Sequence, residues 1–203
     1  MRWNKVEEIG FLEKTKGFLI RPTATFKKVK EEPVGSALKY FVIWLLIYAI
    51  LSAIIFVSIG NMLGAFSPLQ SLSTLGLGAG EILALWLFII ILVGGLVGIF
   101  ISAGIIHIGV LIVGGKQGYH QTLKALAYGN TPTYVLGWIP IVMFITAIWA
   151  LILEILGIRE LHEMSTGKAV LAVLIPLIIF GVILSVIIAA TVYIYVSGMI
   201  GGP

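Results

Sequence analysis

The stretch from Leu38 to Gly60, LKYFVIWLLIYAILSAIIFVSIG, decides the fold class of this chain. It is 23 residues long, and Lys39, near its start, is its one charged residue. An α-helix rises about 1.5 Å per residue, so this stretch is about 34 Å long as a helix, enough to cross a hydrocarbon core of about 30 Å. Ser36 can cap its start, and Pro33 marks the boundary before it. The stretch therefore predicts a membrane-spanning helix.

The composition of the whole chain agrees with this prediction. Of the 203 residues, 60% are hydrophobic and 11% are charged, whereas about 25% of the residues of a soluble domain are charged. The chain has no cysteine, which excludes disulfides and thiolate metal sites. Glu7 and Glu8 interrupt the N-terminus, so we expect no cleaved signal peptide. The basic residues flank apolar segments instead of covering a groove, so we expect no nucleic-acid binding.

Four further apolar segments follow the first. Residues 121–157 are too many for one span, and Pro140, after Gly137 and Trp138, offers a turn between two spans. We therefore predict an all-α membrane protein with a bundle of five transmembrane helices. It comprises a cytoplasmic or interfacial amphipathic arm, residues 1–35, and a membrane domain, residues 36–203. The predicted spans are residues 38–60, 82–113, 121–139, 141–157 and 169–196.

The positions of the basic residues predict the orientation of these spans. With five spans and a cytoplasmic N-terminus, the inner segments are the arm, residues 114–120 and residues 158–168, and the outer segments contain no Lys or Arg. This distribution satisfies the positive-inside rule and puts the C-terminus outside. A four-span arrangement would put Arg159 and Lys168 outside, so we favour five. Lys124, in the first turn of the third span, can extend its side chain inward.

Two short helices are predicted in the arm. Trp3, Val6, Ile9 and Leu12 recur every three residues, although Phe11 and Phe18 lie off that face. A second helix is predicted from Thr23 to Glu32, with Phe26 and Val29 on one side. We favour a solvated arm that lies on the bilayer, with Lys27, Lys28 and Lys30 facing the headgroups. The alternative is a helix that docks a partner.

Neither of two motif-like strings has the residues that its chemistry needs. Gly114-Gly115-Lys116 resembles a phosphate-binding loop, but Val110 stands where that motif has glycine and Gln117 follows the lysine. His162-Glu163 resembles the start of a metalloprotease helix, but no second histidine follows. A metal site would require His107, His120 and His162 to converge. We expect no enzyme activity, no cofactor and no metal site.

Polar residues inside the predicted spans are the second candidate feature. They are Asn130, Thr131, Pro132 and Glu154. Pro132 removes a backbone donor and frees the carbonyl of Tyr128, which a neighbouring side chain, water or another helix must satisfy. Glu154 is either a headgroup-level carboxylate paired with Arg159 or Lys124, or a ligand for a proton or cation. The second reading predicts a small transporter or channel.

Small residues recur at helical spacing in the second predicted span. Gly94, Gly98 and Ser102, continued by Gly109, form a stripe on which another helix can pack closely. This stripe predicts association with a second copy of the chain or with other membrane proteins.

Three strings carry a family resemblance. Gly114 to Pro132, GGKQGYHQTLKALAYGNTP, resembles a loop and the third span of the Yip/YIPF family, the Ypt/Rab-interacting membrane proteins. Gly157 to Ala169, GIRELHEMSTGKA, which follows Trp149, is similar to the loop before that family's last helix. Arg21 to Phe26, RPTATF, resembles its prokaryotic members. The resemblance covers about residues 18–196.

The resemblance implies five spans, a cytoplasmic N-terminus and no catalysis. In eukaryotes the family acts in vesicle traffic, binds Rab-type GTPases and is thought to shape membranes. This chain has no aspartate and so lacks the family's Asp-Leu-Tyr-Gly-Pro motif, and its arm is short. We therefore do not carry GTPase binding over. We expect a prokaryotic plasma membrane as its location.

The sequence thus predicts a non-enzymatic membrane scaffold. Its expected partners are membrane lipids, a second copy of the chain or other membrane proteins. The residues that we expect to dock partners on the inner face are Lys116, Tyr119, Arg159, His162 and Lys168.

Overall fold

The computed structural model describes residues 9–63 and 79–200, and every regular element within them is an α-helix. Trp3 and Val6, part of the amphipathic face predicted for the arm, lie outside the described residues. In chain order the helices are α1 (Phe11–Ile20), α2 (Pro22–Val29), α3 (Val34–Leu63), α4 (Ala79–Ile112), α5 (Tyr119–Gly129), α6 (Thr131–Leu136), α7 (Val142–Leu161) and α8 (Thr166–Ile200).

Four of the described helices are long and apolar enough to cross a membrane. The segments are Val34–Ile59 in α3, Gly80–Ile112 in α4, Val142–Leu161 in α7 and Thr166–Ser197 in α8. With 34 residues, α4 is about 51 Å long, so it must tilt or protrude from a bilayer core of about 30 Å. The chain is a multi-pass, all-α membrane protein, as the sequence predicts.

The predicted third span, residues 121–139, is not one helix in the structure. Helix α5 ends at Gly129, and α6 runs from Thr131 to Leu136. Pro132 lies in the first turn of α6, where a backbone N–H would have no partner within the helix, so its absence costs no helical hydrogen bond. The Thr131 hydroxyl donates to the carbonyl of Tyr128 at 2.5 Å, so a side chain satisfies the freed oxygen, as predicted. Neither helix is long enough to span alone, and the count of five spans is not confirmed.

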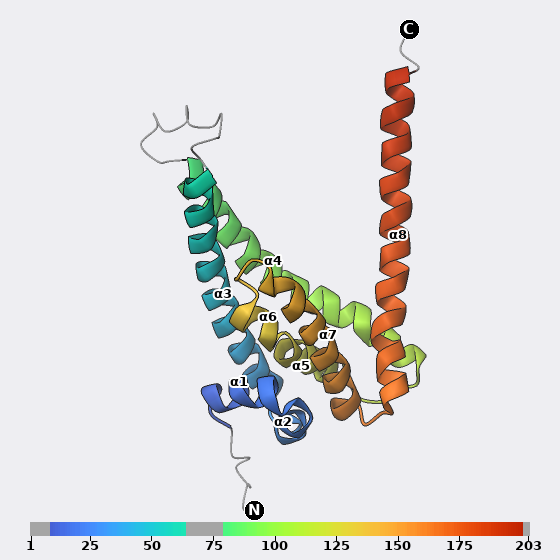
Figure 1. The fold of residues 1–203 in the computed structure, drawn as a ribbon. Helices are drawn as coiled ribbons and strands as arrows, with labels where there is room; N and C mark the ends of the chain where they lie inside the picture. Colours follow the sequence, from blue (N-terminus) through green and yellow to red (C-terminus); the bar gives the residue numbers. More distant parts are fainter. Residues whose placement is uncertain (1–8, 64–78, 201–203) are drawn as a thin grey trace, which may run out of the picture.

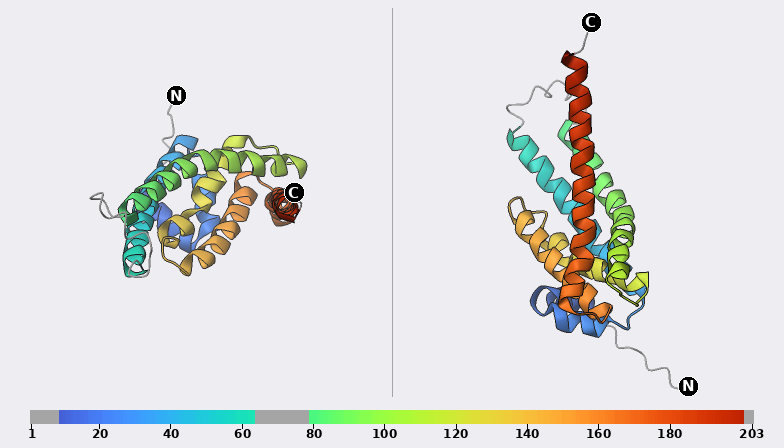
Figure 2. Two further views of the ribbon diagram at one scale, coloured as in Figure 1. Left: turned by 90° about the horizontal axis from the view of Figure 1, so that it is seen from above. Right: turned by 90° about the vertical axis from the view of Figure 1, so that its right-hand side faces the viewer.

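The connections between helices divide between the two ends of the molecule. Helices α1 and α2, the α4–α5 loop (residues 113–118) and the α7–α8 loop (residues 162–165) lie at one end, which we call the polar end (Figure 1). The α6–α7 turn points the other way but reaches less far than the end of α3, as Figure 1 and the right view of Figure 2 show. Ile141 in this turn has φ +73°, a left-handed conformation that is rare for a β-branched residue. Helices α5, α6 and α7 thus form a short hairpin beside longer helices.

The buried core lies toward the polar end. Helix α5 is buried from Gln121 to Gly129 and is surrounded by α3, α4 and α7. Helix α8, by contrast, carries exposed apolar side chains from Leu177 to Val196 and stands apart from the bundle in Figure 1. So large an apolar surface is unsuited to water and suited to lipid.

The arm is part of this core. Phe18, Phe26 and Val29 are fully buried, and the ring of Phe18 lies 4.8 Å from the ring of Tyr128 in α5. The favoured prediction of a solvated arm on the bilayer is therefore wrong for the described residues. Of the predicted face, Ile9 packs against the core, whereas Leu12 is 76% exposed. Docking against α3 and α5 selects the face of α1 that carries Phe18.

Candidate functional site at the polar end

A buried ion pair holds the arm to the bundle. The Lys14 ammonium in α1 lies 2.6 Å from Glu32 Oε2, and the two side chains are 5% and 0% exposed. The same carboxylate oxygen accepts hydrogen bonds from the hydroxyls of Ser36 in α3 (3.1 Å) and Tyr128 in α5 (3.0 Å). Burying two charges costs free energy unless they are paired and hydrogen-bonded. One carboxylate oxygen thus joins α1, α3 and α5.

Lys124 fixes the chain between α2 and α3. Its ammonium donates to the backbone carbonyls of Lys30 at 2.6 Å and Glu32 at 2.8 Å, and the residue is 1% exposed. These carbonyls follow the end of α2, where a cation is favourable for the helix dipole. The prediction that Lys124 extends into the inner headgroups is wrong, because the arm covers it.

A second group of hydroxyls joins α1, α3 and α6. Thr15 Oγ1 accepts hydrogen bonds from the Tyr40 hydroxyl at 3.2 Å and from the Trp44 indole at 3.1 Å. The Tyr40 hydroxyl also lies 3.0 Å from Thr131 Oγ1 at the α5–α6 break. Sequence reasoning missed Lys14, Thr15 and Glu32. A sequence signal for them existed: Lys14 and Thr15 lie on the same side of α1 as Phe11 and Phe18.

The four polar residues predicted inside the spans gather at the α5–α6 break. Asn130 donates from Nδ2 to Glu154 Oε1 in α7 at 2.7 Å and to the Leu126 carbonyl at 3.1 Å. A Cβ on Gly129 would lie 2.8 Å from Glu154 Cγ, so glycine permits this close approach. The predicted pairing of Glu154 with Arg159 or Lys124 is wrong, since Asn130 holds its carboxylate.

The predicted docking residues separate into exposed and buried side chains. Lys116, Tyr119 and Lys168 are exposed. Arg159 is half-buried and bonds Glu160 at 2.6 Å and Thr23 at 3.2 Å. His162 is 4% exposed, so its predicted contact with a partner is incorrect, because it lies under the α4–α5 loop.

His162 belongs to a buried chain of hydrogen bonds. Thr122 Oγ1 lies 2.9 Å from His162 Nε2 and 2.9 Å from His107 Nδ1. Burial, followed in weight by the nearby His107, lowers the pKa of His162 to about 4, so its imidazole is neutral at pH 7. The third histidine, His120, does not complete a metal site, and the described residues contain no group of three or more side chains suited to one.

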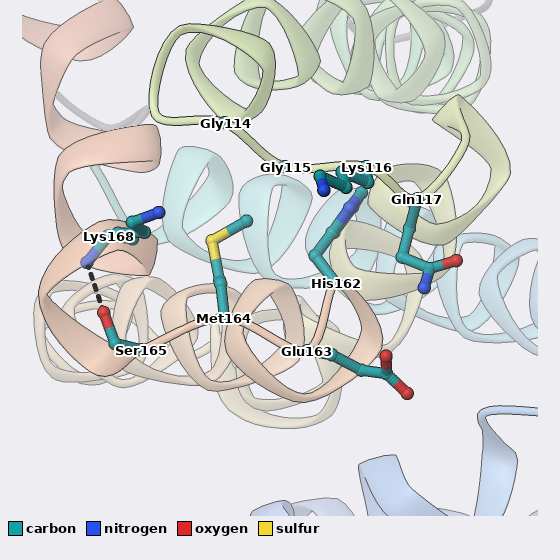
Figure 3. A pocket seen from close by; sticks show the side chains of 9 residues that line it. All are labelled: Gly114, Gly115, Lys116, Gln117, His162, Glu163, Met164, Ser165 and Lys168. Carbon is teal, nitrogen blue, oxygen red and sulfur yellow. Dashed lines mark hydrogen bonds between the residues drawn. The ribbon is translucent and has the colours of Figure 1, made fainter.

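An open cavity of about 430 Å³ lies between the two loops of the polar end (Figure 3). It is lined by residues 114–117 of the α4–α5 loop, residues 162–165 of the α7–α8 loop, and Lys168. Gly114 has φ +84°, which favours glycine. A Cβ on Gly115 would lie 2.3 Å from the side chain of Val110. Both glycines are therefore needed for the tight turn that forms one wall.

The glycines of α4 contact other helices at different positions from those predicted. A Cβ on Gly94 or Gly98 would have no neighbour within 4 Å in the described part of the chain, and Ser102 is exposed. The close approaches occur at Gly95, against Leu45, and at Gly109, where a Cβ would lie 2.1 Å from the carbonyl oxygen of Ala172 in α8. Contact of Gly94, Gly98 and Ser102 with a second molecule stays a prediction.

The comparisons with known proteins agree with the family resemblance. The sequence profile of the Yip1 domain matches residues 16–188, which include most of the arm, the hairpin and both loops of the polar end. No curated protein and no solved structure matches the chain. Because the profile covers well over half of the 203 residues, this chain belongs to the Yip1-domain family of membrane proteins.

Proposed function

We propose that this protein is a non-enzymatic membrane scaffold that binds partners at its polar end, on the cytoplasmic side. The observation that carries the proposal is the buried Lys14–Glu32 pair with its bonds to Ser36 and Tyr128. It fixes the arm as part of a firm surface instead of leaving it a free tail. A prearranged surface lowers the entropy cost of binding a partner.

The exposed side chains of the polar end favour an acidic partner surface. Lys16, Lys27, Lys28, Lys116 and Lys168 are exposed on the arm and the two loops. Their charges steer acidic surfaces toward this end, and this steering weakens as salt rises. The expected partners are other membrane proteins or a second copy of the chain, and the proposal does not include a small GTPase.

We also propose five membrane crossings, with the α5–α6 pair as the third. Of the described connections, the α4–α5 and α7–α8 loops lie at the polar end and the α6–α7 turn lies away from it. All basic residues of the described loops lie at the polar end. Because the chain has no cysteine, a single introduced cysteine reports its own side of the membrane. Cysteines at Lys116 and Lys168 should react only with reagents that reach the cytoplasm, and one at Ile141 only from the other side. Labelling of Ile141→Cys from the cytoplasm would refute the third crossing.

Site-specific photocrosslinking in the native membrane tests the scaffold proposal. Probes at Lys27 and Lys116 should capture the same protein, whereas a probe at the buried His162 serves as the matched control. Capture should fall when Lys27 and Lys28 are both replaced by glutamine. Equal protein capture from all three positions would mark non-specific contact and contradict docking at the polar end.

A small transporter or channel is the alternative function, and the Asn130–Glu154 contact favours it. A carboxylate beside a broken helix is a feature of transporter sites. If this reading holds, Glu154→Gln should reduce solute or ion flux in proteoliposomes, and Glu160→Gln, outside the break, should not. Absence of flux in the unmodified protein across a panel of ions and small solutes would end this alternative.

A further inference from the structure

The cavity of the polar end lies where two apolar helices end. Its α4–α5 wall begins at Gly114, two residues after the span that ends at Ile112, and its other wall precedes the span that starts at Thr166. Two spans therefore end at the cavity. Phosphate groups of a bilayer lie at the boundary where such apolar segments end.

The free charge in this cavity is positive. Lys116 and Lys168 turn their side chains toward the space beneath Gly114 and Gly115 (Figure 3). Neither lysine forms an ion pair within the described residues. Glu163 also lines the cavity, but its carboxylate is bound by Lys30 and points away from both lysines. The cavity thus offers two ammonium groups to an anion.

Two further features of the cavity suit an anion. Helix α8 begins there at Thr166, and the first N–H groups of a long helix attract negative charge. Beside the start of α8, His162 is only 4% exposed, and its Nδ1 has no hydrogen-bond partner in the described part of the protein. A buried polar nitrogen without a partner indicates a missing ligand or water.

A separate apolar groove lies between the same two helices, farther from the polar end. Helices α4 and α8 touch at Gly109 and then separate toward the far side (Figure 1). The groove between them has a volume of about 240 Å³ and is lined by apolar side chains alone. These side chains include Ile105, Ile108 and Ile112 of α4, and Pro176, Ile179 and Ile183 of α8.

We propose that α4 and α8 bind one anionic phospholipid, with its phosphate between Lys116 and Lys168 and one acyl chain in the groove. The cavity alone would fit any phosphate-bearing ligand. The groove lies between the same two helices, and its lining residue Ile112 is two residues from Gly114 of the cavity wall. This proximity favours a lipid, because a free phosphate makes no use of an apolar groove. The occupant is distinct from the protein partner proposed above, and the inference stands if that partner does not exist.

Native mass spectrometry of the purified full chain in a neutral detergent tests this proposal. Phosphatidylglycerol should bind in a one-to-one complex, at least tenfold tighter than phosphatidylcholine. Lys116→Gln with Lys168→Gln should weaken this binding at least tenfold, and arginine at both positions should retain it. The charge-matched control, Lys27→Gln with Lys28→Gln on α2, should change it less than twofold. Equal weakening in the two glutamine pairs would overturn the site.

A second variant separates a lipid from a free phosphate. Ile179→Trp fills the groove and should weaken binding of long-chain phosphatidylglycerol several-fold while leaving a short-chain form unaffected. Inorganic phosphate, tested as a competitor, should displace the lipid only at concentrations far above those of the lipid. If phosphate competes equally well and Ile179→Trp has no effect, the cavity is a phosphate site and the lipid proposal fails. Thermal unfolding of each variant confirms that it is folded.

Discussion

Replacing Lys14 with methionine should release the arm from the bundle. The substitution keeps the length of the apolar stem but leaves the Glu32 carboxylate fully buried without its cation. Breaking a buried pair in this way costs about 3–5 kcal/mol. The hydroxyls of Ser36 and Tyr128 still donate to the carboxylate and partly compensate for the lost cation, so the expected cost lies at the lower end of this range, about 3 kcal/mol. This corresponds to a roughly 100-fold rise in the population of the undocked arm.

Hydrogen exchange of the α2 amides in detergent micelles measures this opening. In Lys14→Met the α2 amides should exchange roughly 100-fold faster, while the amides in the middle of α7 should keep their rates. Lys16→Met removes the same charge from an exposed position of α1, so it serves as the control. It should change the stability of the docked arm by less than about 0.5 kcal/mol.

The double variant Lys14→Met, Glu32→Gln decides whether the pair itself is responsible. Neither buried charge remains, and a glutamine oxygen can still accept the hydrogen bond from Tyr128. The two single effects should therefore not add, and the coupling between them should reach about 2 kcal/mol. Additive single effects, or unchanged exchange in α2, would refute the assignment of arm docking to this pair.

Three other expectations rest on single residues. Because the pKa of His162 is about 4 in the fold against 6.5 for the free side chain, the unfolded chain binds its proton first. The free energy of unfolding should therefore fall as the pH drops below about 6.5 and be about 2 kcal/mol lower at pH 5 than at pH 7. Chemical denaturation at both pH values measures this difference. His162→Gln should abolish it. Gly109→Val should lower the unfolding temperature because its side chain would meet the Ala172 carbonyl, whereas Gly98→Val, with open space around it, should not. Thr131→Val leaves the Tyr128 carbonyl without its donor and should cost about 1–3 kcal/mol of unfolding free energy, with Thr133→Val as the control.

The membrane helices were predictable because length and apolar composition determine them. The first predicted span, residues 38–60, lies inside α3, and the fifth, residues 169–196, lies inside α8. In lipid a backbone must satisfy its own hydrogen bonds, so a long apolar run has few alternatives to a helix. The third span was ambiguous for a physical reason: a proline can kink one helix or begin another, and sequence alone does not distinguish the two.

The candidate site was less predictable because its bonds join distant segments. Glu32 meets Lys14 and Tyr128 only after α1 and α2 fold back on α5, and no local periodicity encodes that return. The Thr131 bond to Tyr128 was predictable because it spans three residues. One wall of the cavity, residues 114–116, stands out in the sequence as an incomplete phosphate-binding motif, but the second wall comes from the loop before α8.

The relative strength of the polar contacts determines which part of the polar end is fixed. The pairs Lys27–Glu160 and Lys28–Glu13 have lysine side chains that are 68% and 64% exposed, so salt screens them and they contribute little to docking. The Lys14–Glu32 pair is shielded from solvent and keeps its strength at physiological ionic strength. An acidic partner or lipid can therefore bind the exposed lysines without breaking the Lys14–Glu32 pair that holds the arm. The bonds inside the polar end hold its shape, and the charges outside remain available for binding, as the proposed scaffold role requires.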